Sequence, residues 1–273
     1  MAEEVARRSP VGCAELTQMI CPARRSRGLT LVELLIAIGV IALLLAILMP
    51  ALSAGRHAAK DVECRAKYRT VVQRFIEFAD ESGAGLRGDS QNLGADRFLL
   101  EDFQESLYQV HEFWQGPKSE SETIKASESP LVCPEKATRL TRRSGVPCSA
   151  GAIGPQKEVS SGFNKRLDRK TRFIKGKPFP TTAFLSSRIL TNPDVPLVFD
   201  VDGAVAVERR IAPYYSAPPM KYDDQKDIYE SGVSWFPAMR HMGRMNVGFI
   251  GGHVLSTDDP VSEPWSRWEF QLD

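Results

Sequence analysis

Residues 29–49 read LTLVELLIAIGVIALLLAILM, a run of 21 residues with a single charged side chain, Glu33. As an α-helix this run would be about 31 Å long, which matches the roughly 30 Å hydrocarbon core of a bilayer. No other stretch of the chain is comparably long and apolar. The sequence therefore predicts a single membrane-spanning helix over 29–49.

The segment before this run, residues 1–28, is polar and gathers Arg24, Arg25 and Arg27 at the edge of the apolar stretch. Basic residues beside a span hold that side in the cytoplasm. We therefore expect a single-pass protein of the cytoplasmic (inner) membrane, with its N-terminus in the cytoplasm and its C-terminal head in the periplasm or outside the cell. Both Met1 and Met19 can serve as the start residue.

The junction RSRGLTLVE at 25–33 resembles the signal of type IV prepilins: a basic leader that ends in Gly, followed by an apolar helix with Glu at its fifth position. Pro50 also stands where such proteins commonly have a proline. The resemblance implies cleavage between Gly28 and Leu29 by a prepilin peptidase and N-methylation of Leu29. It further implies that the helix is retained as membrane anchor and filament core.

Glu33 needs a partner or a task, because a carboxylate within a membrane helix costs about 2.5–3.5 kcal/mol on insertion scales. Cleavage after Gly28 would place a new amine on Leu29, four residues earlier, which is a spacing at which helical charges meet. In a filament Glu33 could instead pair with the amine of a neighbouring subunit and set the axial register. The alternative is a structural one, in which Glu33 reaches to the membrane interface.

Ordinary secretion is the competing interpretation of the N-terminus. A secretory signal has an apolar core of about 7–15 residues followed by small residues. The apolar run here is longer, but the sequence ALS at 51–53 could serve ordinary signal peptidase and release a soluble chain.

Beyond Pro50, apolar residues recur at steps of three and four up to about residue 82, so the helix should continue until the glycines at 83, 85 and 88. The expected segments are a leader at 1–28, a transmembrane helix at 29–49, an extramembrane half of that helix at 50–82 and a head at 83–273. In the head we expect a helix at 97–114 and a loop at 117–130. Strands are expected at 130–133, 161–164, 195–199, 204–207, 246–250 and 253–256.

Gly and Pro interrupt the strands of the head, and Gly251-Gly252 suits a hairpin turn. The expected fold class is α+β: a pilin-like long N-terminal helix, transmembrane in its first half, packed on a small antiparallel sheet. Four stretches also resemble the head of a pseudopilin-like family that ends in a His-x9-Asp-Gly signature. They are LVCPEK at 131–136, GFN at 162–164, VFDVDG at 198–203 and RHMGRMNVGFIGGHV at 240–254.

In this second resemblance His241 matches the family's histidine and Gly252 its glycine, while Gly251 replaces the aspartate. Candidates for a metal site are Asp200, Asp202, His241 and His253, but a His beside a turn is typically structural, so no metal is predicted. Calcium, as in some pseudopilins by resemblance, would draw on Asp200, Asp202, Asp223, Asp224 and Asp227. The spacing of these acids is not that of an EF-hand, and we expect no cofactor.

Cys133 and Cys148 lie in the expected exported region, so a disulfide between them is one prediction, and two unpaired core cysteines are the other. No CxxC pair or Cys/His cluster has zinc-like spacing. GxSxG, phosphate-loop and HExxH motifs are also absent from the sequence, so the chain is not expected to be an enzyme.

The net charge of +1, without a basic tract after residue 28, excludes nucleic acid as an expected partner. The predicted function is a structural subunit of a type II secretion or type IV pilus-like filament. Its expected partners are prepilin peptidase, other pilin-like subunits, an inner-membrane assembly platform and the lipid bilayer. The alternative is a membrane-tethered extracytoplasmic binding protein that uses the helix only as an anchor.

Overall fold

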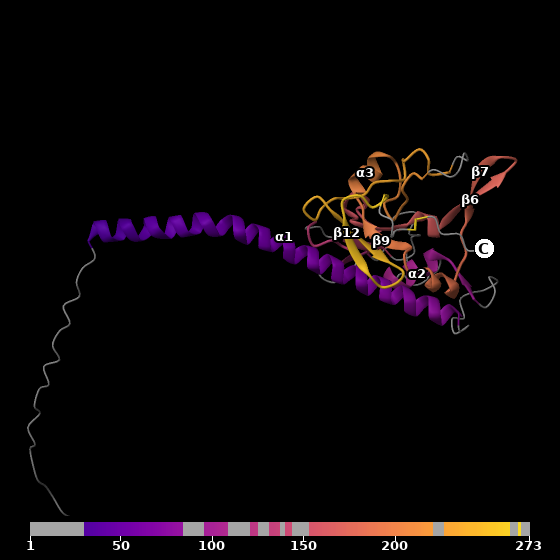
Figure 1. Cartoon of the computed structure of the whole chain (residues 1–273), viewed down its shortest axis with the longest axis horizontal. Helices are drawn as coiled ribbons and strands as arrows, with labels where there is room; N and C mark the ends of the chain where they lie inside the picture. The colour runs from indigo at the N-terminus through magenta and orange to yellow at the C-terminus, as the bar shows by residue number, and fades with distance from the viewer. Residues whose placement is uncertain are drawn as a thin grey trace, which may run out of the picture. The chain divides into compact units, whose positions relative to one another are not determined.

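The computed structural model describes residues 30–83, 96–108, 121–124, 131–136, 140–143, 153–220, 227–262 and 267–268 (Figure 1). The chain divides into two compact units, Met1–Pro50 and Ala51–Asp273. Three α-helices are found among the described residues: α1 (Leu31–Gly83), α2 (Leu100–Tyr108) and α3 (Gly203–Glu208). Short 3₁₀ helices are η2 (Gln156–Glu158), η3 (Lys165–Leu167) and η4 (Ser187–Thr191).

Helix α1 has two parts with different surroundings, and the boundary between the two units falls just after Pro50, inside the helix. Every side chain from 31 to 59 is exposed. From Asp61 onward one face of α1 is buried, with residues at steps of three and four that match the apolar pattern of the sequence. The buried residues of α1 are Asp61, Cys64, Tyr68, Val71, Val72, Phe75, Phe78, Ala79 and Ser82.

A five-stranded sheet forms the centre of the second unit, in the order β10-β5-β9-β11-β12. Its pairs are antiparallel except for β10 with β5, which is parallel. The part of α1 after Pro50 packs directly on this sheet (Figure 1). Val72 of α1 lies so close to Gly248 of β11 that a Cβ added to this glycine would be 3.1 Å from Cγ2 of Val72. The strands are β5 (Ser161–Asn164), β9 (Pro196–Asp200), β10 (Tyr215–Ser216), β11 (Met245–Phe249) and β12 (Val254–Thr257).

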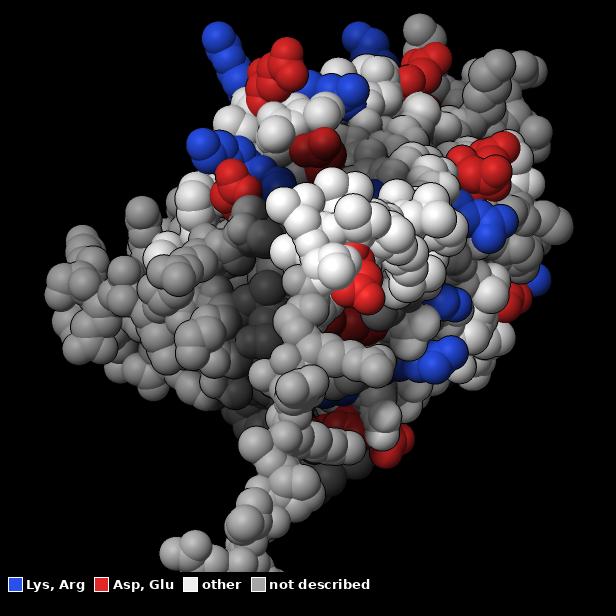
Figure 2. Space-filling model, turned by 90° about the vertical axis from the view of Figure 1, so that its left-hand side faces the viewer, with Lys and Arg blue, Asp and Glu red and all other residues white. Residues whose placement is uncertain are grey.

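Three smaller sheets accompany the central one. β2 (Ser121–Ile124), β3 (Leu140–Arg143) and β4 (Ile153–Gly154) form an antiparallel sheet. β6 (Arg169–Ile174) and β7 (Lys177–Thr182) form a hairpin, and β1 (Arg97–Phe98) pairs with β8 (Leu185–Ser186). On the face shown in Figure 2, basic and acidic side chains lie interspersed.

The α+β class and the long N-terminal helix are confirmed. The predicted strands at 161–164, 195–199, 246–250 and 253–256 correspond to β5, β9, β11 and β12, and the last two form the expected hairpin. Gly252 has a φ of +91°, which a residue without a Cβ adopts at little cost.

The strand predicted at 204–207 was wrong, because these residues belong to α3. Asp202 caps this helix: its carboxylate accepts hydrogen bonds from the backbone amides of Ala204 and Val205. Gly203 opens the helix so close to η2 that a Cβ would lie 2.4 Å from the carbonyl oxygen of Gln156. The cap therefore overrides the strand preference of the two valines.

Three further boundaries differ from prediction. Residues 131 and 132 form a turn and a bend instead of a strand, and a second turn follows at 133–136, where the Lys136 amide donates a hydrogen bond to the Cys133 carbonyl oxygen. The predicted loop at 117–130 contains β2, which pairs with β3. The predicted helix at 97–114 begins only at Leu100, where Asp102 accepts a hydrogen bond from the Leu99 amide, and residues 109–114 lie outside the described residues.

Candidate functional site

Two of the predicted site residues, Asp200 and His241, meet in the core of the head together with two cysteines. Nε2 of His241 lies 3.4 Å from Oδ2 of Asp200 and 3.5 Å from Sγ of Cys133. Sγ of Cys64 lies 3.8 Å from Oδ1 of Asp200. One ligand atom from each of the four residues falls within 4.8 Å of all the others, and all four residues are buried. We call Cys64, Cys133, Asp200 and His241 the core cluster.

Each member of the core cluster comes from a different element. Cys64 lies on the buried face of α1, and Asp200 is the last residue of β9. Cys133 is held in its turn by a 2.8 Å hydrogen bond from its backbone amide to Oγ of Ser160. His241 precedes β11 and exchanges two backbone hydrogen bonds with Arg244. The helix, the sheet and two loops therefore converge on one point.

Polar side chains surround the core cluster and contact its acid and its histidine. Asp200 accepts hydrogen bonds from the Tyr68 hydroxyl at 2.9 Å, the Asn246 backbone amide at 2.7 Å and Nη1 of Arg240 at 3.4 Å. Nδ1 of His241 lies 3.5 Å from Oδ1 of Asp61. Three donors thus bond to the Asp200 carboxylate, and the Asp61 carboxylate faces the second ring nitrogen of His241.

The close packing shifts the proton affinities of the cluster. Burial opposes the charged form of His241, but hydrogen bonds to Asp200 and Cys133 outweigh it and raise the pKa of His241 to about 10. A hydrogen bond from the Cys64 thiol, assisted by His241, lowers the pKa of Cys133. The same pairing, together with burial, raises the pKa of Cys64. The contacts within the cluster therefore favour the deprotonated form of Cys133 and the protonated form of His241.

The remaining predicted acids and His253 lie in other places. Asp202 caps α3, and His253 stacks on Phe249 with ring centroids 4.5 Å apart. Asp227 is buried and paired with Arg166 at 2.5 Å. Asp223 and Asp224 lie outside the described residues. The described acids that were considered for calcium therefore have separate partners and do not converge on a common site.

The disulfide predicted between Cys133 and Cys148 involves one residue outside the described part of the chain, Cys148. Cys133 itself carries a free, buried thiol, as does Cys64. The pairing of Cys133 with Cys148 stays a prediction.

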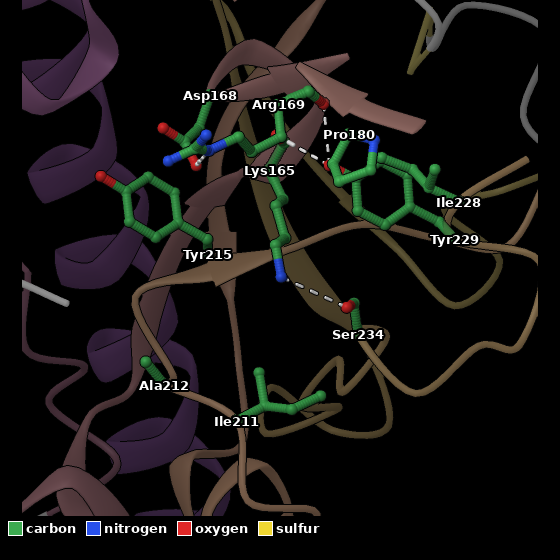
Figure 3. Close-up of a pocket in the computed structure, with 10 residues that line it drawn as sticks. All are labelled: Lys165, Asp168, Arg169, Pro180, Ile211, Ala212, Tyr215, Ile228, Tyr229 and Ser234. Atoms are coloured by element: carbon green, nitrogen blue, oxygen red, sulfur yellow. Dashed lines mark hydrogen bonds and ion pairs between the residues drawn. The ribbon is translucent and has the colours of Figure 1, made fainter. Parts of the chain in front are cut away.

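A cavity of about 500 Å³ opens at the base of the β6–β7 hairpin, within the range of small-molecule sites (Figure 3). Lys165 points across it to Oγ of Ser234 at 3.4 Å, and the Tyr229 hydroxyl donates to the carbonyl oxygen of Arg169 at 2.8 Å. Burial lowers the pKa of Lys165 and raises the pKa of Asp168. The lining residues are Lys165, Asp168, Arg169, Pro180, Ile211, Ala212, Tyr215, Ile228, Tyr229 and Ser234.

At the N-terminus the described residues begin at Thr30, so Gly28 and Leu29 lie outside them. Thr30 and Glu33 bond to each other in both directions: Oε2 of Glu33 accepts hydrogen bonds from the Thr30 amide at 2.8 Å and from its hydroxyl at 2.9 Å. The Glu33 amide in turn donates to Oγ1 of Thr30 at 3.2 Å. This is a capping box, which satisfies amides that the start of a helix leaves unpaired.

Among the described residues, none covers the apolar part of α1. Its large side chains are more than half exposed up to Leu52, for example Leu31 at 78% and Met49 at 69%. Among the described residues, α1 is the one helix long and apolar enough to cross a membrane. Apolar surface of this extent is typical of a segment that contacts lipid or other protein subunits.

A family model of the prokaryotic N-terminal methylation motif matches residues 23–49. This segment is a type IV pilin-like signal. The prepilin-type signal covers about a tenth of the chain and indicates a type IV pilin-like or pseudopilin-like precursor. No curated protein and no solved structure matches the chain. The resemblance of the head to the His-x9-Asp-Gly family stays a prediction.

The prepilin-type signal is evident in the sequence, whereas half of the core cluster, Cys64 and Cys133, is not. Cys64 and Cys133 are 69 positions apart and have no metal-like spacing, so no local motif indicates that they meet. One pattern in the sequence does indicate that Cys64 is buried. Cys64, Tyr68 and Val72 are spaced four residues apart, so they lie on the same face of α1, the face that packs on the sheet.

Proposed function

We propose that the chain is cleaved between Gly28 and Leu29 by a prepilin peptidase, methylated on Leu29, and assembled as a structural subunit of a type II secretion or type IV pilus-like filament. The prepilin-type signal at 23–49 carries this proposal. The exposed apolar part of α1 supports it, because an anchor that becomes a filament core must present apolar side chains all around.

The proposed location is the cytoplasmic membrane before assembly. Arginines at the edge of the apolar run favour a cytoplasmic N-terminus and a head on the far side. The partners follow from this pathway: the prepilin peptidase, an inner-membrane assembly platform and other pilin-like subunits. The head, which contains most of the residues of the chain, would lie at the filament surface.

In this proposal Glu33 has two tasks that can be separated. Within one chain it closes the capping box with Thr30. In a filament its charge would pair with the amine on Leu29 of a neighbouring subunit. Gln also fits the third position of a capping box but carries no charge. Glu33→Gln therefore removes only the ionic task, whereas Glu33→Ala removes both.

The experiment compares Glu33→Ala, Glu33→Gln and Thr30→Val by membrane extraction and by cross-linking to other pilin-like subunits. We expect all three variants to stay in the membrane. Glu33→Ala and Glu33→Gln should both lose cross-linked assemblies, and Thr30→Val, which keeps the charge, should retain them. Assembly of Glu33→Ala and Glu33→Gln at the native level would contradict the filament function.

The cavity favours a second candidate function, a membrane-tethered binding protein of the extracytoplasmic space. Its volume of about 500 Å³ and its mixed apolar and charged lining suit a small ligand. In that case α1 would serve only as an anchor, and substitution of Glu33 would leave function unchanged. A substitution that fills the cavity, Ala212→Phe, would then abolish function while leaving any assembly intact.

A further inference from the structure

The core cluster brings together two sulfur atoms, one imidazole nitrogen and one carboxylate oxygen, all from buried residues. We propose that Cys64, Cys133, Asp200 and His241 bind one Zn²⁺ ion in a closed, four-ligand site that fixes the head to α1. These three atom types are the ligands that zinc takes in proteins, and thiolate sulfur selects zinc over magnesium or calcium.

The distances between ligand atoms fit a tetrahedral ion. Zinc bonds of about 2.3 Å to sulfur and about 2.0 Å to nitrogen or oxygen separate a sulfur from a nitrogen by about 3.5 Å, and a nitrogen from an oxygen by about 3.3 Å. The observed values are 3.5 Å from Cys133 Sγ to His241 Nε2 and 3.4 Å from His241 Nε2 to Asp200 Oδ2. These two pairs already have the spacing of a bound ion, and the remaining pairs of ligand atoms lie within 4.8 Å, so Cys64 would move closer on binding.

The two ring nitrogens of His241 face the kinds of group that a metal-ligating histidine uses. A ligating His donates its second ring N–H to a carboxylate or carbonyl, which fixes its tautomer. Here Nε2 faces the core cluster, and Nδ1 faces Oδ1 of Asp61 at 3.5 Å. In the described part of the chain, the buried Nδ1 makes no hydrogen bond of good geometry. Asp61 is itself positioned by Nδ2 of Asn246 at 2.8 Å and by Arg65 at 2.8 Å.

The ligating carboxylate is supported in the same way. Asp200 is fully buried, and each of its oxygens accepts a hydrogen bond, Oδ1 from the Tyr68 hydroxyl and Oδ2 from the Asn246 amide. A carboxylate oxygen has two lone pairs, so Oδ2 can accept this hydrogen bond and still bind an ion. Two thiolates and Asp200 would carry three negative charges, which Zn²⁺ together with Arg240 balances.

Burial indicates a structural site instead of a catalytic one. The four residues are between 0% and 3% exposed, and four protein ligands leave no position for water or substrate. The ligands come from α1, from the turn at 131–136, from β9 and from the segment before β11. One ion would therefore cross-link four segments that are distant in sequence, and its binding would stabilise the folded head.

A disulfide is the competing arrangement of the same sulfur atoms, either between Cys64 and Cys133 or between Cys133 and Cys148. It would not require His241 and Asp200 to converge on the cysteines. The metal content and the mass of the protein distinguish the two, since a disulfide lowers the mass by two hydrogens and removes two thiolate ligands.

The test uses the full chain, purified from membranes in detergent under mild reduction and dialysed after addition of ZnCl₂. We expect one zinc per chain by elemental analysis, and loss of zinc in Cys133→Ser and His241→Gln. Cys148→Ser is the matched control and should keep its zinc. Exchange for Co²⁺ should give the visible bands of a tetrahedral cobalt site and thiolate-to-cobalt charge transfer.

Asp61→Asn covers the case in which the ligand variants fail to fold. Within the core cluster this positioning residue faces only Nδ1 of His241, the ring nitrogen turned away from the ion. Its replacement should therefore weaken zinc affinity by about 10–100-fold and leave the cobalt spectrum of the loaded protein intact. Native chain that binds no more zinc than Cys133→Ser, or that is recovered with Cys133 in a disulfide, would overturn the proposal. These results do not bear on filament assembly, which is tested at Glu33.

Discussion

The hydroxyl of Tyr68 on α1 donates a 2.9 Å hydrogen bond to Oδ1 of Asp200, 132 residues later at the end of β9. The same hydroxyl lies 3.0 Å from Oγ of Ser161 on β5. Tyr68 and Asp200 are both fully buried. A single side chain therefore ties the long helix to two neighbouring strands of the central sheet.

Tyr68→Phe keeps the ring in the core and removes only the hydroxyl. We expect a loss of about 1–3 kcal/mol in the free energy of unfolding, because the buried Asp200 carboxylate loses a donor. Denaturant unfolding of the full chain in detergent measures the change. Thr70→Val, which removes an exposed hydroxyl from the same helix, is the control and should change the free energy of unfolding by less than about 0.5 kcal/mol. If both substitutions lowered the free energy of unfolding equally, the hydrogen bond from Tyr68 to Asp200 would not stabilise the fold.

Gly251→Asp would restore the residue that the resembled family has in its signature, and we expect it to destabilise this chain. A Cβ at Gly251 would lie 2.5 Å from Cβ of Pro193 and 2.9 Å from its carbonyl oxygen. Overpacking of this kind costs about 1–3 kcal/mol. The midpoint of thermal unfolding should fall accordingly.

Gly55→Ala is the control for this substitution, because an added Cβ there meets nothing within 4 Å. The variant should be as stable as the native chain or slightly more stable, since Ala favours a helix over Gly. A Gly251→Asp chain that unfolds at the native temperature would contradict the close approach of Pro193 to the β11–β12 turn.

Asp168→Asn tests the electrostatics of the cavity. Burial raises the native pKa of Asp168 above its ordinary 3.8, despite Arg169 and Lys165 nearby. The native state therefore binds this proton more tightly than the unfolded chain does. Its stabilising contribution is complete below the unfolded pKa and is lost as the pH rises through the raised native pKa.

Asn removes this titration. The stability of Asp168→Asn relative to the native chain should therefore increase from about pH 4 to about pH 7. Thermal unfolding at the two pH values gives the difference, with Asp258→Asn at an exposed position as the control. A difference between native chain and Asp168→Asn that is independent of pH would mean that the carboxyl is not desolvated.

The elements that the sequence predicted best are those with a complete local signal. The helix over 29–82 has an uninterrupted apolar run, then a three- and four-residue pattern, and it ends at Gly83 as expected. The hairpin of β11 and β12 has two β-rich runs around Gly251-Gly252. Both patterns are short-range, so neighbouring residues suffice to specify them.

What the sequence did not predict depends on contacts between distant segments. Valines at 205 and 207 favour a strand, but the cap from Asp202 and the close packing of Gly203 produce α3. In the core cluster, Asp200 and His241 were found as candidates, whereas Cys64 and Cys133 were not. The cysteines meet only because α1 crosses the sheet beside the turn at 131–136, which no local pattern specifies.

Intact-mass and N-terminal peptide analysis of the chain, made in cells with and without prepilin peptidase, tests the proposed processing most directly. With the peptidase, the mature chain should begin at Leu29, carry a methyl group on its α-amine and remain in the membrane fraction. Without the peptidase, the leader should stay attached. A water-soluble chain that begins at Ala54 in both strains would contradict the processing pathway and the filament function built on it.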